Sequence, residues 1–181
     1  MSTRRTLLGS LPALGMLSLA APGHAAAPAR PGYRVPGFEL LYECDVTLTP
    51  AEEFGKTVEG TRRIIPITGG TFSGPKLRGT VVPGGADWNL QRSDGASSVE
   101  AAYYLKTDDG VLIRIVNKGV SDPALRRPAT DTSEGFAMFT IPVFEAPVGR
   151  YDWLNRATFV GTLGTRKDAK NAVLIRVFQL A

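Results

Sequence analysis

The chain has 181 residues, a formal net charge of +4 at pH 7, one histidine and one cysteine. Its length suits a single domain, since domains commonly hold about 100–150 residues, and its basic runs, no longer than the pairs Arg62–Arg63 and Arg126–Arg127, argue against a nucleic-acid partner. The histidine, His24, lies in the N-terminal leader described next, which excludes a histidine-dependent triad or zinc site from the rest of the chain.

The first segment, residues 1–27, has the order of an export signal. Arg4 and Arg5 precede an apolar stretch, Leu7–Ala21, that is too short and too interrupted by glycine to span a bilayer. Small residues around Ala25 then provide a cleavage site, and the arginine pair resembles a twin-arginine signal. We therefore predict a cleaved leader rather than a membrane anchor, a periplasmic or secreted protein, and no membrane contact after cleavage.

Residues 28–37 contain three prolines and two glycines and predict an extended lead-in to a domain over 38–181. The following segment, FELLYECDVTLT, alternates apolar and polar residues, which predicts a strand with one buried face over 38–49. Cys44 belongs to the apolar set. It is therefore predicted to be a buried structural thiol rather than a nucleophile.

Further segments rich in β-branched and aromatic residues follow, separated by turn residues. They cover residues 61–68, 76–82, 98–107, 111–119, 135–145, 156–166 and 172–180.

The connections between these segments are short, and the residues 108–110, Asp-Asp-Gly, predict a hairpin turn. Helical periodicity is not sustained after the leader, although 50–54 and 151–155 could each form one helical turn. The glycine-rich stretch 69–75 lacks the lysine of a phosphate-binding loop and predicts a bend. About eight or nine short strands predict an all-β fold, a single antiparallel β-barrel, because closure leaves no exposed edge strand.

Four segments in order, GGTFSGPKLRGTVVPGGADW, TDDGVLIRIVNKG, FEAPVGRYDWLNRATFVGT and VLIRVFQL, resemble DUF3237, a bacterial family of unknown function. The resemblance extends over Phe38–Leu180. It implies a lipocalin-like antiparallel β-barrel and no established activity. The chain departs from the pattern at Glu100 and Ala102, where the resemblance implies an aspartate and an arginine. If that pair shapes a pocket in the family, the site here is altered.

The candidate site residues lie within or beside these segments. The candidate catalytic residues are Asp87, Glu145 and Tyr103, and the candidate ligand-binding residues are Trp88, Asn117, Trp153, Asn155 and Arg156.

A barrel of this size gathers such side chains at its mouth, where one small ligand fits. We expect Asp87 and Trp88 to face one pocket, also lined by Trp153 or Asn155, in which the indole shields the carboxylate and raises its pKa. Glu145 is then the expected partner of Asp87. In the alternative interpretation, Asp87 is a turn residue that caps backbone amides and the indoles fill the barrel core.

The sequence therefore predicts an exported barrel protein that binds a small apolar or aromatic molecule in the barrel mouth. The alternative is a cofactor-free isomerase, cyclase or lyase with a carboxylate base. No metal or other cofactor is expected, since no calcium-binding loop spacing is present. A buried, hydrogen-bonded carboxylate favours the enzyme, and an apolar interior without one favours the binding protein. The oligomeric state stays open.

Overall fold

The structure is a computed structural model, and it describes residues 32, 35–125, 134–166, 169 and 171–181. Contacts between residues divide the chain into two units, Met1–Val35 and Pro36–Ala181. The predicted leader lies outside the described residues, and its cleavage stays a prediction.

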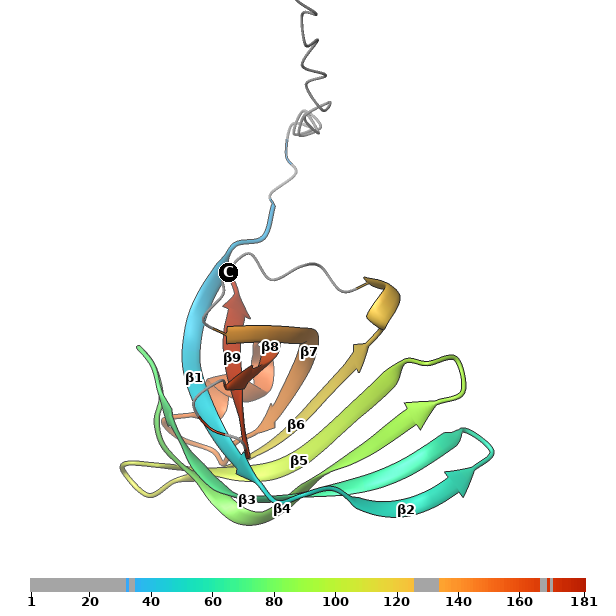
Figure 1. Cartoon of the computed structure of the whole chain (residues 1–181). Helices are drawn as coiled ribbons and strands as arrows, with labels where there is room; N and C mark the ends of the chain where they lie inside the picture. The colour runs from blue at the N-terminus through green and yellow to red at the C-terminus, as the bar shows by residue number, and fades with distance from the viewer. Residues whose placement is uncertain (1–31, 33–34, 126–133, 167–168, 170) are drawn as a thin grey trace, which may run out of the picture. The chain divides into compact units, whose positions relative to one another are not determined.

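The second unit consists almost entirely of β-strands (Figure 1). The strands are β1 (Phe38–Leu48), β2 (Glu52–Thr57), β3 (Gly60–Ser73), β4 (Arg78–Arg92), β5 (Ser97–Thr107), β6 (Leu112–Ser121), β7 (Glu134–Glu145), β8 (Phe159–Arg166) and β9 (Ala172–Leu180); the short 3-10 helices are η1 (Pro123–Leu125) and η2 (Asp152–Arg156).

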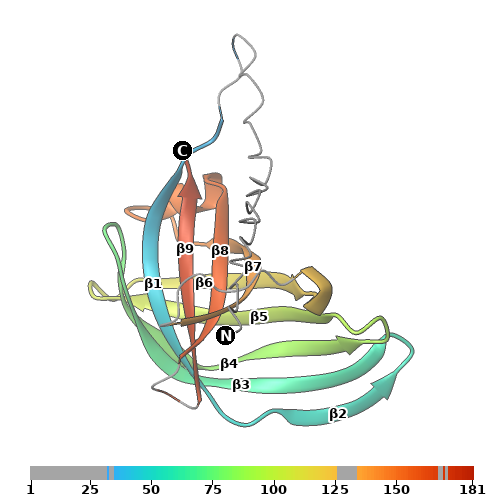
Figure 2. The same cartoon turned by 45° about the horizontal axis from the view of Figure 1, so that its top comes forward.

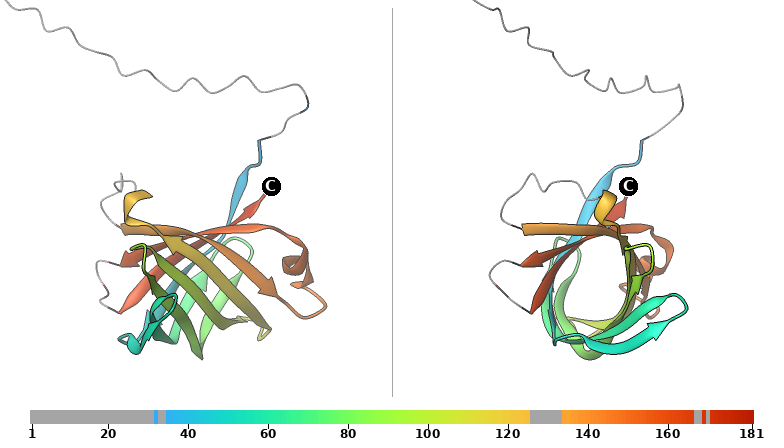
Figure 3. Two further views of the ribbon diagram at one scale, coloured as in Figure 1. Left: turned by 90° about the vertical axis from the view of Figure 1, so that its right-hand side faces the viewer. Right: turned by 45° about the vertical axis from the view of Figure 1, so that its right-hand side comes forward.

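The strands form one antiparallel sheet that closes on itself. Their order is β1-β9-β8-β7-β6-β5-β4-β3-β2, and an additional pairing of β1 with β3 completes the ring. Figure 2 shows β1, β9 and β8 side by side. In the right-hand view of Figure 3 the closed ring of strands is seen through its opening. The predicted all-β antiparallel barrel is therefore confirmed. β2 is the one described strand outside the ring, and it pairs with the first half of β3.

β3 changes partners along its length. Its first half pairs with β2, and the segment Ile67–Ser73 pairs with β1 to close the barrel. Gly70, at the start of the second half, has a φ of 139°, and a Cβ there would collide with the carbonyl oxygen of Asp45 on β1. Only glycine allows the two backbones to approach so closely. The predicted glycine-rich bend at 69–75 therefore begins inside a strand.

β4 does not end at residue 82, where the sequence pattern predicted, but runs on to Arg92. Its pairing with β5 shifts register between Val82 and Ala86, so Pro83-Gly84-Gly85 forms a bulge rather than a connection between strands. A Cβ on Gly85 would lie 2.5 Å from both the carbonyl oxygen of Ala102 and the Cβ of Tyr103. The bulge thus packs directly on β5.

The two predicted helical turns have different outcomes. The turn predicted at 50–54 is wrong, because β2 begins at Glu52 and pairs with β3. A tight turn ends this hairpin: the hydroxyl of Thr57 donates to the carbonyl oxygen of Gly60 and accepts from the N–H of Glu59. The turn predicted at 151–155 is confirmed as η2, and β8 consequently starts only at Phe159.

The connections β3–β4, β5–β6 and β7–β8 gather at one end of the barrel, which we call the η2 end. Leu154 of η2 is 1% exposed and belongs to the apolar core. Aromatic rings of the same core pack against one another: Phe144 and Phe159 lie edge to face with centroids 4.9 Å apart, and Tyr42 and Phe72 are tilted with centroids 5.4 Å apart. η2 therefore covers an apolar end, while the polar groups described next lie further along the strands. No helix among the described residues is long and apolar enough to cross a membrane.

Candidate functional site

Asp87 lies on β4, past the bulge and toward the end of the barrel opposite η2. It pairs with Ala101 on β5, and residues directly opposite in an antiparallel pair share one face of the sheet. Ala101 is buried in the core cluster together with Tyr103, two residues further along the same strand face. The carboxyl group of Asp87 therefore belongs to the inner face of the barrel.

Both oxygens of the Asp87 carboxyl group accept hydrogen bonds. The backbone N–H of Glu100 donates to Oδ1 at 2.9 Å, and Nδ2 of Asn89 makes a longer contact of 3.4 Å with Oδ2. Asn89 is itself oriented by Arg63, whose Nη2 and Nε donate to Oδ1 of Asn89 at 2.6 and 3.2 Å. A chain of contacts thus runs from Arg63 through Asn89 to Asp87.

Burial is the largest influence on the Asp87 carboxyl and raises its pKa above the ordinary value of 3.8. The hydrogen bonds from Glu100 and Asn89 and the charge of Arg63 oppose this shift without cancelling it. The Asp87 side chain keeps some contact with solvent, since the residue is only partly buried. The result is a reachable carboxyl group with a raised pKa, as general acid–base chemistry requires.

Asn117 on β6 lies in the same row of inward residues as Asp87. Asp87 pairs with Ala101, Ala101 pairs with Asn117, and Asn117 pairs with Pro142 on β7. Two steps between strands place the Cα atoms of Asp87 and Asn117 about 10 Å apart. Ala101 between them carries only a methyl group, so no large side chain of β5 stands between the two polar residues in this row.

Five buried side-chain atoms find no hydrogen-bond partner among the described residues. They are Tyr42 Oη, Tyr103 Oη, Asn117 Oδ1, Asn117 Nδ2 and Thr140 Oγ1. All four residues are 2% exposed or less. Since a buried polar atom without a partner costs about 1–3 kcal/mol, each of these atoms calls for a partner from outside the chain. We call these four residues the inner polar set.

Three of the predicted site residues, Asp87, Tyr103 and Asn117, thus come together on the inner face. Trp88 does not join them. Successive strand residues point to opposite faces, and Trp88 is 45% exposed on the outer side, opposite Ile64. The expectation that Asp87 and Trp88 face one pocket is wrong, because the residues belong to a strand rather than to a turn.

Glu145 also lies on the outer face, where its carboxylate forms an ion pair with Arg114 at 3.4 Å and is 75% exposed. It pairs in register with Arg114 while its neighbour Phe144 points into the core. The expected partnership of Glu145 with Asp87 is therefore not formed. Alternation along β7 decides which of two adjacent residues can reach the interior.

Trp153, Asn155 and Arg156 lie on η2, far along the strands from Asp87. Trp153 packs against Phe159 with ring centroids 6.2 Å apart, as a partly buried cover of the core. The side chain of Asn155 bonds both the N–H and the carbonyl oxygen of Ala146. Arg156 forms an ion pair with Asp152 one turn earlier. The contacts of these three residues hold the η2 connection in place.

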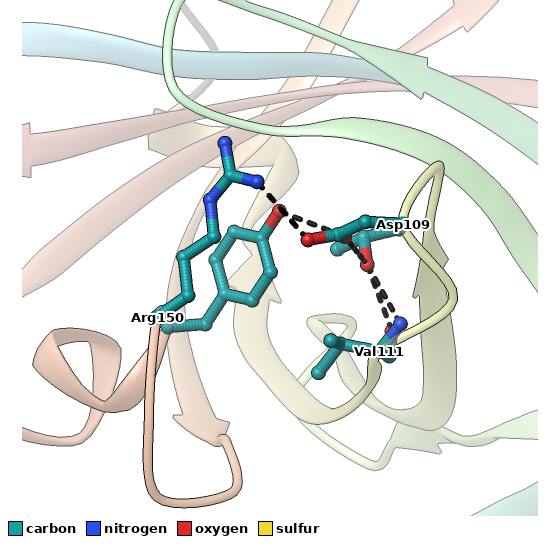
Figure 4. Close-up of polar contacts among 5 residues, drawn as sticks. Asp109, Val111 and Arg150 are labelled. Atoms are coloured by element: carbon teal, nitrogen blue, oxygen red, sulfur yellow. Dashed lines mark hydrogen bonds and ion pairs between the residues drawn. The ribbon is translucent and has the colours of Figure 1, made fainter.

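A polar clamp fastens the η2 connection to the β5–β6 hairpin (Figure 4). The phenol of Tyr151 donates to Oδ1 of Asp109 at 3.0 Å, and Arg150 pairs with Oδ2 at 3.1 Å. The hydroxyl of Thr107 binds the same carboxylate and accepts from the N–H of Val111. These bonds, led by that from Thr107, lower the pKa of the Asp109 carboxyl.

The two departures from the family pattern both lie on the outer face of β5. Glu100 forms an ion pair with Lys118 at 3.1 Å, and Ala102 pairs with Val116. Their side chains alternate with the inward Ala101 and Tyr103. The departures therefore leave the inner face unchanged, although the backbone N–H of Glu100 still holds Asp87.

Cys44 is fully buried, as expected for a structural thiol, and burial raises its pKa to about 12. Within the described part of the chain, no group of three or more histidine, cysteine or acidic side chains could hold a metal ion.

Sequence reasoning missed Tyr42, Thr140, Asn89 and Arg63. The signal for the first two was present, since each is a polar residue at an inward position of an alternating segment. Asn89 and Arg63 gave no such signal, because their role depends on the pairing of β3 with β4 beyond the bulge.

The family model described as "Protein of unknown function (DUF3237)" matches residues 36–180. A UPF0311 protein of Rhodopseudomonas palustris is 33% identical over 156 residues, which cover 80% of this chain and 98% of that protein. A β-barrel-like protein of Acinetobacter baumannii has a similar solved structure, with a TM-score of 0.69, 31% identity, and coverage of 84% of this chain and 100% of that one.

Another relative is named for an enzymatic activity. The hydroalkoxylation enzyme phnH of Penicillium herquei is 28% identical over 147 residues, which cover 81% of this chain and 86% of that protein.

Proposed function

This chain belongs to the DUF3237 family of proteins of unknown function, and from that premise we propose that it is an enzyme that transfers a proton to and from a small unsaturated substrate held inside the barrel. The reaction class is isomerisation by ring closure, in which a hydroxyl group adds across a C=C bond of the same molecule. Asp87 is the catalytic carboxyl group.

The observation that carries this proposal is the state of the Asp87 carboxyl. It lies on the inner face, is partly buried, has a raised pKa, and is held by Glu100 and Asn89. A carboxyl group with a raised pKa can give up and take back a proton near neutral pH more readily than an ordinary aspartate. The name of the fungal relative, a hydroalkoxylation enzyme, supports the same reaction class.

The proposed step balances within one molecule. The neutral Asp87 carboxyl gives its proton to one alkene carbon, the substrate hydroxyl oxygen bonds to the other, and the carboxylate accepts the hydroxyl proton. One O–H bond and one π bond break, and one C–H bond and one C–O bond form. Asp87 returns to its starting state, and no oxidant, reductant or second substrate is consumed.

Two hydroxyalkenes test the reaction class, 2-allylphenol and the aliphatic 4-penten-1-ol. The purified protein should convert at least one to its cyclic ether, followed by proton NMR. In D₂O the product should carry one deuterium on carbon, since the proton comes from the exchangeable Asp87 carboxyl. Failure of both compounds to cyclise, or a product without deuterium on carbon, would contradict the proposal.

Ligand binding without turnover is the second candidate, and the inner polar set favours it. Four uncharged residues with unpartnered buried atoms suit a carrier as well as an enzyme. The two functions differ in turnover: a carrier should bind its ligand, and neither the wild type nor the Asp87→Asn variant should form product.

A further inference from the structure

We propose that the inner polar set, Tyr42, Tyr103, Asn117 and Thr140, is the binding site for an oxygen atom of an uncharged ring compound, which is the substrate class of the barrel. This inference rests on the proposed function, because it assigns the substrate of the same interior. It is based on five polar side-chain atoms, in four almost fully buried residues, that have no hydrogen-bond partner among the described residues.

The four residues of the inner polar set come from four different strands. Tyr42 comes from β1, Tyr103 from β5, Asn117 from β6 and Thr140 from β7. Tyr42 and Tyr103 belong to the same core cluster, and the hydroxyl groups of both are buried without a hydrogen-bond partner among the described residues. Thr140 packs with its hydroxyl against Gly161, which pairs with Val177, and Val177 pairs with Tyr42. Strand pairing thus links Thr140 to Tyr42 through Gly161 and Val177.

The chemistry of the set selects an uncharged ligand. All buried polar residues in the described part of the chain are uncharged: Asn89, Thr107, Asn117, Ser121 and Thr140. An anionic ligand held among them would lose its hydration without meeting a buried cation, which is costly. The guanidinium of Arg63 already binds Asn89. Hydroxyl and amide groups can both donate to a carbonyl oxygen and accept from a hydroxyl group.

The residues that surround the inner polar set favour a ligand that contains a ring. The Tyr42 ring packs against Phe72 with centroids 5.4 Å apart and against Phe144 with centroids 6.3 Å apart. Aromatic walls favour planar, apolar molecules that offer edge or face contacts. On the inner face, Ala101 on β5 lies between Asp87 on β4 and Asn117 on β6. A ring compound hydrogen-bonded to Asn117 would therefore extend toward the catalytic carboxyl group of Asp87.

The test is calorimetric titration at pH 7 with three probes of one shape: 2-naphthol, naphthalene and 2-naphthoate. The protein should bind 2-naphthol at least about 10-fold more tightly than naphthalene and more tightly than the anion. The variants Tyr42→Phe and Tyr103→Phe should each weaken 2-naphthol about 3–10-fold, the loss of one hydrogen bond, and leave naphthalene unchanged. Because phenylalanine keeps the ring, both variants should fold as the wild type does.

Tyr104→Phe is the matched control, since Tyr104 follows Tyr103 on β5 but is 49% exposed and points outward. It should leave the affinity for every probe unchanged. Equal affinity for naphthol and naphthalene, tighter binding of naphthoate, unchanged naphthol affinity in both inner variants, or no naphthol binding at all would each overturn the proposal. Water molecules alone would then be the partners of these atoms.

The two proposals fail separately in this design. If 2-naphthol binds as expected while no hydroxyalkene is cyclised, the reaction class is wrong and the ligand class stands. If a hydroxyalkene is cyclised while the tyrosine variants keep full naphthol affinity, the ligand class is wrong and the reaction class stands.

Discussion

The side chain of Asp87 is subject to two opposing influences. Partial burial favours its neutral form, and the contacts from Glu100, Asn89 and Arg63 favour the carboxylate. Burial prevails, so the folded protein binds a proton at this carboxyl more readily than the unfolded chain does. The raised pKa of Asp87 therefore lowers the free energy of unfolding at neutral pH. Such a cost in stability is common for catalytic groups.

This balance predicts how stability depends on pH. Because the folded pKa of Asp87 is raised, its favourable contribution is complete below the ordinary pKa of 3.8 and is lost as pH rises through the folded value. The Asp87→Asn variant does not titrate there. It should therefore gain stability relative to the wild type between pH 3.5 and pH 7, measured as the difference in Tm at each pH.

Asp109 provides a contrast of opposite sign. Its pKa is lowered, first by the Thr107 hydroxyl and then by Tyr151 and Arg150. Its contribution is therefore lost as pH falls through the lowered value, and Asp109→Asn should be most destabilising at neutral pH. Equal pH dependence in the two variants would contradict the assignment of Asp87.

Part of the site could be predicted at the level of single residues. Asp87, Tyr103 and Asn117 were identified from motifs and lie on the inner face, but their functional roles stay predictions. Trp88 and Glu145 were chosen for the same reason and point outward, because each belongs to a strand whose phase the sequence left ambiguous. For Trp88 the ambiguity came from Pro83-Gly84-Gly85, which is typical of a turn yet forms a bulge inside β4.

At the scale of elements, the bulge in β4 interrupts the pairing with β5 without exchanging the inner and outer faces of the strand beyond it. Val81 is buried before the bulge, and Asp87 is inward after it. The two extra residues keep the phase of alternation, since Val81 and Asp87 are separated by an even number of positions, and they bend the strand. Gly85 makes this arrangement possible, because its backbone lies directly against Ala102 and Tyr103.

Gly85→Ala should therefore destabilise the protein. A Cβ would lie 2.5 Å from the carbonyl oxygen of Ala102, and relief of the clash would displace the bulge at a cost of about 1–3 kcal/mol. Gly37→Ala is the matched control, since the added carbon would meet only the Ala181 carbonyl oxygen, at an ordinary 3.9 Å. Urea unfolding of both variants measures the difference, and equal midpoints would contradict the packing described for the bulge.

The clamp on η2 gives a second prediction at this scale. Tyr151→Phe removes the hydrogen bond to Asp109 but keeps the ring in place, so it should cost about 1 kcal/mol. For a chain of this length that corresponds to a fall in Tm of about 2–4 °C. The exposed Tyr104→Phe serves again as the control. If both variants melted together, the clamp would contribute nothing to closing this end.

At the scale of the whole molecule, the barrel could be predicted because its evidence is spread over the chain. Alternation in separate segments, short turns and the need to hide edge strands all indicate closure. β2 was not predicted, because Glu52 and Glu53 interrupt the apolar pattern of the segment. Its identity as a strand depends on its pairing with β3. The strand order likewise depends on contacts between distant segments.

Export is a further prediction at this scale. We propose that the chain is processed near Ala25 and delivered to the periplasm or the medium, on the order of basic, apolar and small residues in the leader. Amino-terminal sequencing of the exported protein should begin at Ala26 or close to Pro28. A sequence that begins at Met1 or Ser2 would contradict it. Replacement of Arg4 and Arg5 by lysine should block export by the twin-arginine route.

The most direct test of the central claim, that Asp87 carries out proton transfer inside the barrel, is the rate of hydroxyalkene cyclisation by three proteins. The wild type and Glu145→Gln should have equal rates, since Glu145 lies on the outer face. Asp87→Asn should retain the fold but cyclise the substrate about 10²–10⁴-fold more slowly. A rate for Asp87→Asn equal to that of the wild type would contradict the claim.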